Sequence, residues 1–127
     1  MFTASACTSI VSNVTENLAN NLAIAIMNQD DPELVRNGAP AYLLLLDSLI
    51  EGDSENPVIL SAAANLYASY GSIFVDDDER SKRLTKKALA YSSKSLCLSL
   101  ELTCYWEEYT YQGYLDVLSD IDERHAE

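Results

Sequence analysis

The sequence predicts an all-α fold made of antiparallel helical hairpins packed side by side. Its 127 residues include only four Gly and three Pro, so the frequent turn signals of a β-sandwich or barrel are missing. Apolar residues recur three and four positions apart along most of the chain, which is the spacing of one face of a helix. Asp31-Pro32 and Asn56-Pro57 each place a good N-cap before a Pro, which suits the first helical position. The length suits one domain, and a hydrophobic fraction of 48% is too high for a disordered chain.

Two helices are expected in the first half of the chain, over about residues 9–28 and 32–51. In the second of them, Pro40 cannot donate to the helical hydrogen-bond ladder, so we expect a kink or short break near Asn37. Gly52 is a natural C-terminal stop. The apolar faces are formed by Ile10, Val14, Leu18, Leu22, Ala25 and Ile26 in the first helix and by Tyr42, Leu43, Leu45, Leu46, Leu49 and Ile50 in the second.

Three further helices are expected over about residues 57–75, 79–100 and 109–123. The three residues Asp76–Asp78 precede the fourth helix, where negative charge stabilises a helix N-terminus. A calcium site is the weaker alternative for them, because loop calcium sites alternate their oxygen ligands and usually include a Gly turn. The predicted buried side of the fourth helix is formed by Leu84, Ala88, Tyr91, Ser95 and Leu98.

Helices joined by short polar segments are typical of stacked helical hairpins. The third and fourth helices resemble a degenerate tetratricopeptide (TPR) unit, in which small residues lie where two helices cross. Ser81 and Ala88 are the expected contacts on the fourth helix, opposite a row of small residues on the third: Ala62, Ala63, Ala64, Ala68 and Gly71. We therefore expect residues 9–127 to form one TPR-like α-solenoid domain.

The charge pattern excludes one class of partner and indicates another. A net charge of −12 repels phosphate backbones, so nucleic acid is not an expected partner. Six of the eight basic residues lie between Arg80 and Lys94. Four of these form a candidate partner face: Lys82, Arg83, Lys86 and Lys87. The alternative is a solvated face that balances the nearby Asp residues. No apolar run reaches the ~18–20 residues of a membrane-spanning helix.

The sequence lacks the usual motifs of catalysis. It has no Gly-x-Ser-x-Gly, no phosphate-binding loop, no HExxH and a single histidine, His125. We therefore expect no enzyme activity, no cofactor and no metal, with a carboxylate-dependent hydrolase as the remote alternative. Cys97 and Cys104 are expected to be free, half-buried thiols, because seven residues of continuous helix would separate their Cα atoms by about 10 Å, too far for a disulfide. They could pair only if the chain breaks between them.

Aromatic residues provide the candidate binding surfaces. Tyr67, Tyr70 and Phe74 share the third helix and are candidates for a ligand groove, with core packing as the alternative. Trp106 and Tyr109 are candidates for a binding rim, or they cap the last hairpin.

The first eight residues have the pattern of the end of a bacterial lipoprotein signal. Small residues directly precede Cys7, the residue that would carry lipid after processing, although a basic and apolar leader is missing. We expect residues 1–8 to be a signal remnant and Cys7 to be the lipid anchor, which would be the chain's only attachment to a membrane.

One long stretch resembles a known family. It comprises Pro40-Ala41-Tyr42-Leu43-Leu44-Leu45-Leu46-Asp47-Ser48-Leu49, then Ala62-Ala63-Ala64-Asn65-Leu66-Tyr67-Ala68-Ser69-Tyr70-Gly71, then Asp77-Asp78-Glu79-Arg80 and Lys82-Arg83-Leu84-Thr85. Over about residues 18–97 the chain resembles the T component of TRAP transporters, the TatT family.

This resemblance implies a periplasmic, lipid-anchored accessory protein with TPR-like hairpins. The implied partner is the periplasmic solute-binding subunit of a TRAP transporter. The resemblance also implies a homo-oligomer, a trimer whose pores pass small hydrophobic ligands. We expect this chain to correspond to the N-terminal half of the family domain, which puts the trimer in doubt and predicts self-association through an exposed apolar edge. The alternative function is a cytosolic TPR-like protein–protein adaptor.

Overall fold

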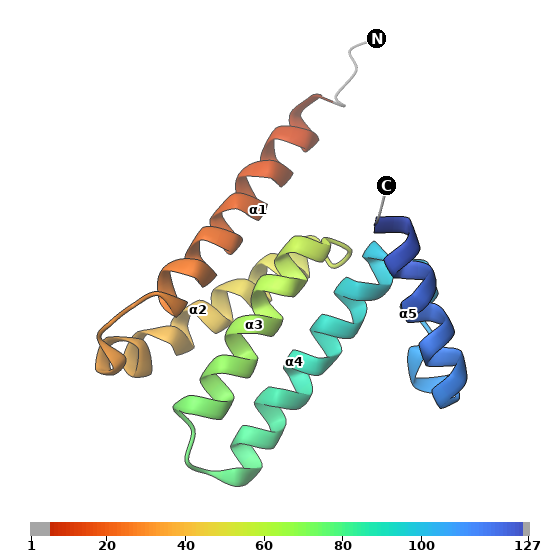
Figure 1. The fold of residues 1–127 in the computed structure, drawn as a ribbon. Coiled ribbons are helices and arrows are strands. Elements are labelled where there is room, and N and C mark those ends of the chain that lie inside the picture. Colours follow the sequence, from red (N-terminus) through yellow and green to blue (C-terminus); the bar gives the residue numbers. More distant parts are fainter. Residues whose placement is uncertain (1–5, 126–127) are drawn as a thin grey trace.

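The computed structural model describes the backbone of residues 6–125 and the side chains of residues 13–121. Within this part the fold is all-α. The elements in chain order are α1 (Ala6–Met27), α2 (Pro32–Gly52), α3 (Pro57–Ile73), α4 (Asp78–Ser99), the 3₁₀ turns η1 (Glu101–Thr103) and η2 (Trp106–Glu108), and α5 (Tyr111–His125) (Figure 1). The predicted all-α fold of antiparallel hairpins is confirmed, and the arrangement is solenoid-like; the closer likeness to TPR units stays a prediction.

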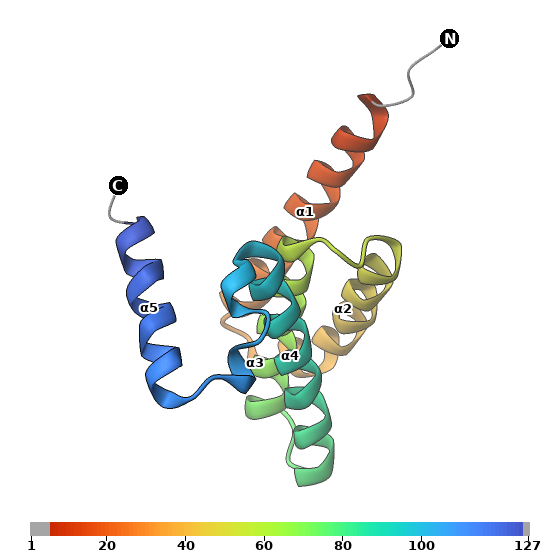
Figure 2. The same ribbon diagram turned by 90° about the vertical axis from the view of Figure 1, so that its right-hand side faces the viewer.

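Helix α3 is the centre of the fold. Helices α1, α2 and α4 all pack against it, and its antiparallel pairing with α4 is the most extensive contact (Figures 1 and 2). Its side chains supply most of the fully buried apolar volume, together with Leu46 of α2: Ile59, Leu60 and Leu66. Because α3 is covered on three sides, α1, α2 and α4 are all positioned by this one helix.

The close approach of α3 and α4 depends on small residues. A Cβ added to Gly71 would lie 3.1 Å from the Cβ of Leu84, so only Gly fits at this distance without a shift of the neighbouring helix. The Ser81 hydroxyl donates to the Gly71 carbonyl oxygen at 2.8 Å, and Ala88 is buried two turns further along α4. The prediction that Ser81 and Ala88 lie at the helix crossing is confirmed.

Local caps set the starts of three helices. Asp31 accepts hydrogen bonds from the backbone N–H groups that follow it, and Asn56 does the same at the start of α3. Asp77 accepts from the Arg80 N–H at 2.7 Å. These bonds satisfy backbone donors that have no partner inside the helix. They confirm the predicted N-caps, including the capping role of the Asp76–Asp78 cluster.

Of the kink or short break predicted near Asn37, the break is wrong, because α2 runs without interruption from Pro32 through Pro40 to Gly52. The missing N–H of Pro40 leaves the Arg36 carbonyl oxygen without its helical donor. The Tyr70 hydroxyl, from α3, donates to that oxygen at 3.1 Å. A tertiary contact thus supplies the hydrogen bond that the proline removes.

The prediction of free thiols is also wrong: Cys97 and Cys104 form a disulfide, with their Cα atoms 4.4 Å apart. Pairing is possible because α4 ends at Ser99 and the chain turns through η1 before Cys104.

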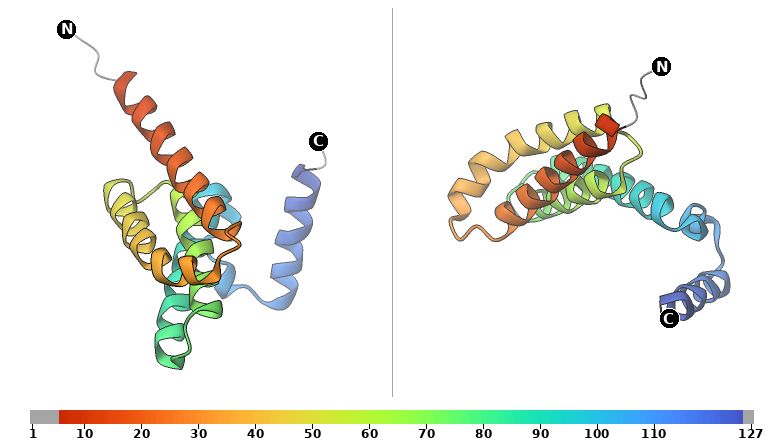
Figure 3. Two further views of the ribbon diagram at one scale, coloured as in Figure 1. Left: turned by 90° about the vertical axis from the view of Figure 1, so that its left-hand side faces the viewer. Right: turned by 90° about the horizontal axis from the view of Figure 1, so that it is seen from above.

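After η2, α5 runs apart from the other helices and shares little contact with them (Figure 3). Over the described residues, every helix is too short or too polar to cross a lipid bilayer.

Candidate functional site

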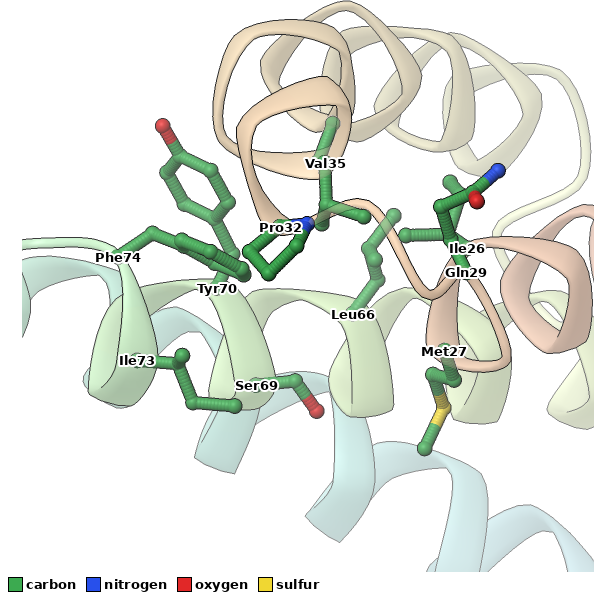
Figure 4. Close-up of a pocket in the computed structure, with 11 residues that line it drawn as sticks. Ile26, Met27, Gln29, Pro32, Val35, Leu66, Ser69, Tyr70, Ile73 and Phe74 are labelled. Atoms are coloured by element: carbon green, nitrogen blue, oxygen red, sulfur yellow. The ribbon is translucent and has the colours of Figure 1, made fainter.

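An apolar pocket lies where the end of α1, the start of α2 and the second half of α3 meet (Figure 4). Its volume is about 300 Å³, at the lower end of the range of small-molecule sites. The lining is almost entirely apolar, with Gln29 and Ser69 as its polar members. The lining residues are Ile26, Met27, Gln29, Pro32, Val35, Ala39, Leu66, Ser69, Tyr70, Ile73 and Phe74. Such a lining suits an apolar ligand with few polar groups.

Two of the predicted groove residues, Tyr70 and Phe74, form one end of this pocket (Figure 4). Their ring centroids are 5.7 Å apart. The Arg36 guanidinium lies 5.5 Å from the centroid of the Phe74 ring and donates to the Phe74 carbonyl oxygen at 3.2 Å. The Arg80 guanidinium lies 5.9 Å from the centroid of the Tyr70 ring. Both rings are therefore held in place by contacts from outside the pocket, which preorganises this end of it.

The third predicted groove residue, Tyr67, does not line this pocket. It is buried where α2, α3 and α4 meet, and its hydroxyl donates to Asp47 at 2.7 Å. Tyr91 donates to the other carboxylate oxygen of Asp47 at 2.8 Å, and the Lys87 ammonium forms an ion pair with the same carboxylate. The Lys87 nitrogen also lies 4.8 Å from the centroid of the Tyr67 ring and 5.5 Å from that of Tyr91. We call these four residues the three-helix junction.

The contacts within the junction shift the pKa values of Asp47 and Lys87 in the directions that keep both groups ionised. Burial alone would raise the pKa of Asp47, but hydrogen bonds from Lys87, Tyr67 and Tyr91 outweigh it and lower the pKa. Burial alone would lower the pKa of Lys87, but the hydrogen bonds and charge of Asp47 raise it well above its usual range. Burial and the bond to Asp47 raise the pKa of Tyr91 to about 12. At neutral pH the carboxylate and the ammonium are both ionised, so the junction acts as a structural tie between three helices.

The predicted basic face divides into two parts. Lys82, Arg83 and Lys86 are exposed, and Lys82 pairs with Glu79 at 3.0 Å within the same helix. The Lys87 side chain is 39% exposed against 72% for Lys82, because it turns toward Asp47. We call Lys82, Arg83 and Lys86 the exposed basic face. Lys86 lies four residues after Lys82 and three after Arg83, which places the three on one side of α4.

The two predicted rim residues lie away from the apolar pocket. Tyr109 donates to the Leu102 carbonyl oxygen at 2.8 Å and lines a separate hollow beside the end of α4. Trp106 lies 6.5 Å, ring to ring, from Tyr114 of α5. The structure therefore does not join Trp106 and Tyr109 to Tyr70 and Phe74. The side chain of Cys7, the predicted lipid anchor, lies outside the described side chains.

Sequence reasoning missed Asp47 and Arg36. Asp47 interrupts an otherwise apolar stretch of α2 that includes Leu43, Leu46 and Ile50, and an acid next to a buried face usually has a partner there. That signal could have identified the junction. Arg36 gave no such signal, because its partners are the carbonyl and ring of Phe74, 38 residues away.

Comparison with known proteins identifies the family. The sequence model of the TRAP transporter T-component matches residues 28–127, most of the chain, including the turn after α4 and the whole of α5. No curated protein and no solved structure matches the chain. The family match extends the similarity well beyond the residue at which the TatT resemblance ended. The chain therefore belongs to the TRAP transporter T-component family.

Proposed function

We propose that this protein, as an accessory component in TRAP transport, binds the transporter's solute-binding subunit through the exposed basic face of α4. The observation that carries the proposal is a cluster of exposed cations on a chain whose net charge is −12. Such a cluster attracts an acidic surface and raises the rate of association with it. The role is one of binding, without catalysis.

The test measures binding of the full chain to the purified solute-binding subunit by biolayer interferometry at low and high salt. The triple variant Lys82→Glu, Arg83→Glu, Lys86→Glu is expected to weaken binding at least about tenfold, since like charges would then oppose each other. The matched control exchanges the cations without changing charge: Lys82→Arg, Arg83→Lys, Lys86→Arg. Equal binding by the charge-reversed variant and the wild type would refute the proposal.

We also propose that the apolar pocket takes a small hydrophobic ligand. Its lining and its fixed aromatic end support this, because apolar pockets with few polar groups favour apolar molecules. A fluorescent apolar probe should bind the wild type. Ser69→Phe would fill the pocket from its rim and abolish the signal, whereas Ser72→Phe, one turn away and outside the lining, should retain it. Equal probe binding by both variants would show that the probe lies elsewhere.

We propose a periplasmic location with a lipid anchor at Cys7. The Cys97–Cys104 disulfide supports this, because disulfides persist in oxidising compartments such as the periplasm and are rare in the cytosol. Cell fractionation with a lipid label is the measurement. The label is expected on the wild type and not on Cys7→Ser, and a cytosolic, unlabelled wild type would contradict the proposal.

A further inference from the structure

The end of α4 is not encoded by the residues that usually stop a helix. From residue 73 to residue 112 the sequence contains no Pro and no Gly. Helices commonly end with Gly or Asn in a left-handed conformation, whereas the residue after α4 is Leu100, with extended backbone (φ −142°, ψ 97°). Local chemistry therefore does not explain why the helix stops at Ser99.

The apolar spacing of α4 also continues past its end. Tyr91 and Ser95 lie four residues apart on the side of α4 that packs against α3, and the exposed Leu98 follows three residues later. The same intervals then reach Leu102, Tyr105 and Tyr109. Spacing of this kind is typical of one face of a continuous helix. The sequence from Asp78 to about Glu108 is thus compatible with one longer helix.

The disulfide excludes that longer helix. Continuous helix would separate the Cα atoms of Cys97 and Cys104 by about 10 Å. In the bonded state they are 4.4 Å apart. The bond and the extended helix cannot coexist, so the state of the cysteines selects between two paths of the chain.

We infer that the Cys97–Cys104 disulfide is a redox-controlled hinge that sets the direction of α5. When it is closed, α4 ends at Ser99; when it is open, α4 extends through residues 100–108. The contacts that position α5 are local, namely Trp106 with Tyr114 and Tyr109 with the Leu102 carbonyl. Because α5 shares little contact with α1–α4, it follows the segment before it.

The opening reaction needs a dithiol reductant. One of its thiolates attacks a sulfur of the disulfide to form a mixed disulfide, and its second thiol then releases the protein. Two electrons and two protons pass to Cys97 and Cys104, and the reductant leaves as a disulfide. Neither cysteine is fully buried.

Hydrogen exchange of the full chain, with Cys7→Ser in every sample, tests the hinge with and without a dithiol reductant. Opening is expected to slow exchange at the amides of residues 101, 102 and 105–107 by at least about tenfold, since they would gain helical hydrogen bonds. The amides of Thr103, Cys104 and Glu108 already donate to backbone oxygens. Helical ellipticity should rise by roughly a tenth. Emission from Trp106, the single tryptophan, should shift as Tyr114 moves away.

Two variants make the outcome decisive. Cys97→Ala with Cys104→Ala should show the slowed exchange without reductant and no further response to it. Adding Leu102→Pro to that pair should abolish the slowed exchange, because Pro blocks helix extension. Unchanged or faster exchange at residues 101, 102 and 105–107 in the reduced wild type would overturn the inference, as would slowed exchange that survives Leu102→Pro.

Discussion

The Tyr70 hydroxyl donates a 3.1 Å hydrogen bond to the Arg36 carbonyl oxygen, the oxygen that Pro40 leaves without a helical donor. The bond joins α3 to α2 beside the apolar pocket. It also explains how α2 contains a proline in its interior and remains continuous. The same tyrosine ring forms one end of the pocket, so the fold and the candidate ligand site depend on one side chain.

Tyr70→Phe is expected to lower the free energy of unfolding by about 1–2 kcal/mol, because the Arg36 carbonyl would lose its donor. In a Pro40→Ala background the new backbone N–H can donate to that oxygen. In that background, Tyr70→Phe should lower the free energy of unfolding by at least about 0.5 kcal/mol less than in the wild type. A double-mutant cycle with urea denaturation measures this coupling. Equal costs in both backgrounds would show that the hydroxyl does not replace the missing N–H.

Asp47→Asn is expected to destabilise the protein by about 2 kcal/mol at pH 7, because it leaves the Lys87 ammonium without its carboxylate; partial exposure of both groups limits the loss. The pKa of Asp47 is lowered in the fold, so its contribution is complete above about pH 4 and is lost as pH falls through the folded pKa.

At alkaline pH the stability changes in the opposite direction, because it falls as pH rises. The pKa of Tyr91 is raised to about 12, so its contribution is complete below pH ~10 and is lost as pH rises toward 12. Thermal unfolding from pH 2.5 to 11.5 measures both ends. The wild type should lose more stability than Asp47→Asn below pH 4, and parallel curves would contradict the role of the junction.

Gly71→Ala is expected to destabilise the protein by about 1 kcal/mol, because the new Cβ lies 3.1 Å from the Leu84 Cβ, an atom that cannot rotate away. Gly38→Ala is the matched control, since it is also helical and its Cβ would meet nothing within 4 Å. That control should stabilise by up to about 1 kcal/mol through helix propensity. Chemical denaturation measures both, and a stabilising Gly71→Ala would show that α3 and α4 can separate at little cost.

The chain is expected to self-associate through α5. Leu115 and Leu118 are 38% and 44% exposed on a helix that shares little contact with the rest of the described protein. Leu115→Glu with Leu118→Glu should shift the protein toward monomer in sedimentation velocity. Leu44→Glu, at a 70% exposed position on α2, is the control and should leave the distribution unchanged. A wild type that sediments as a monomer at high concentration would contradict the prediction.

Local signals predicted much of the fold. Asp31, Asn56 and Asp77 cap helices through bonds to backbone two or three residues away, and such bonds are visible in the sequence. Gly71 could be predicted as a crossing point because small residues cluster around it.

Long-range contacts explain the errors. The continuity of α2 depends on Tyr70, 34 residues from Arg36, and the placement of Lys87 depends on Asp47, 40 residues away. Pairing of Cys97 with Cys104 required a chain break that Leu100 does not signal. Of the candidate site, Tyr70 and Phe74 could be predicted as neighbours on one helix, whereas the walls from α1 and α2 follow from packing alone.

The most direct test of the proposed function is site-specific photo-cross-linking to the solute-binding subunit. A photoreactive phenylalanine at Ala90, exposed one turn beyond Lys86 on the same side of α4, is compared with one at Leu44 on α2. Docking through the exposed basic face predicts a covalent complex from position 90 and none from position 44. Cross-linking from position 44 alone, or from neither position at saturating partner, would contradict it.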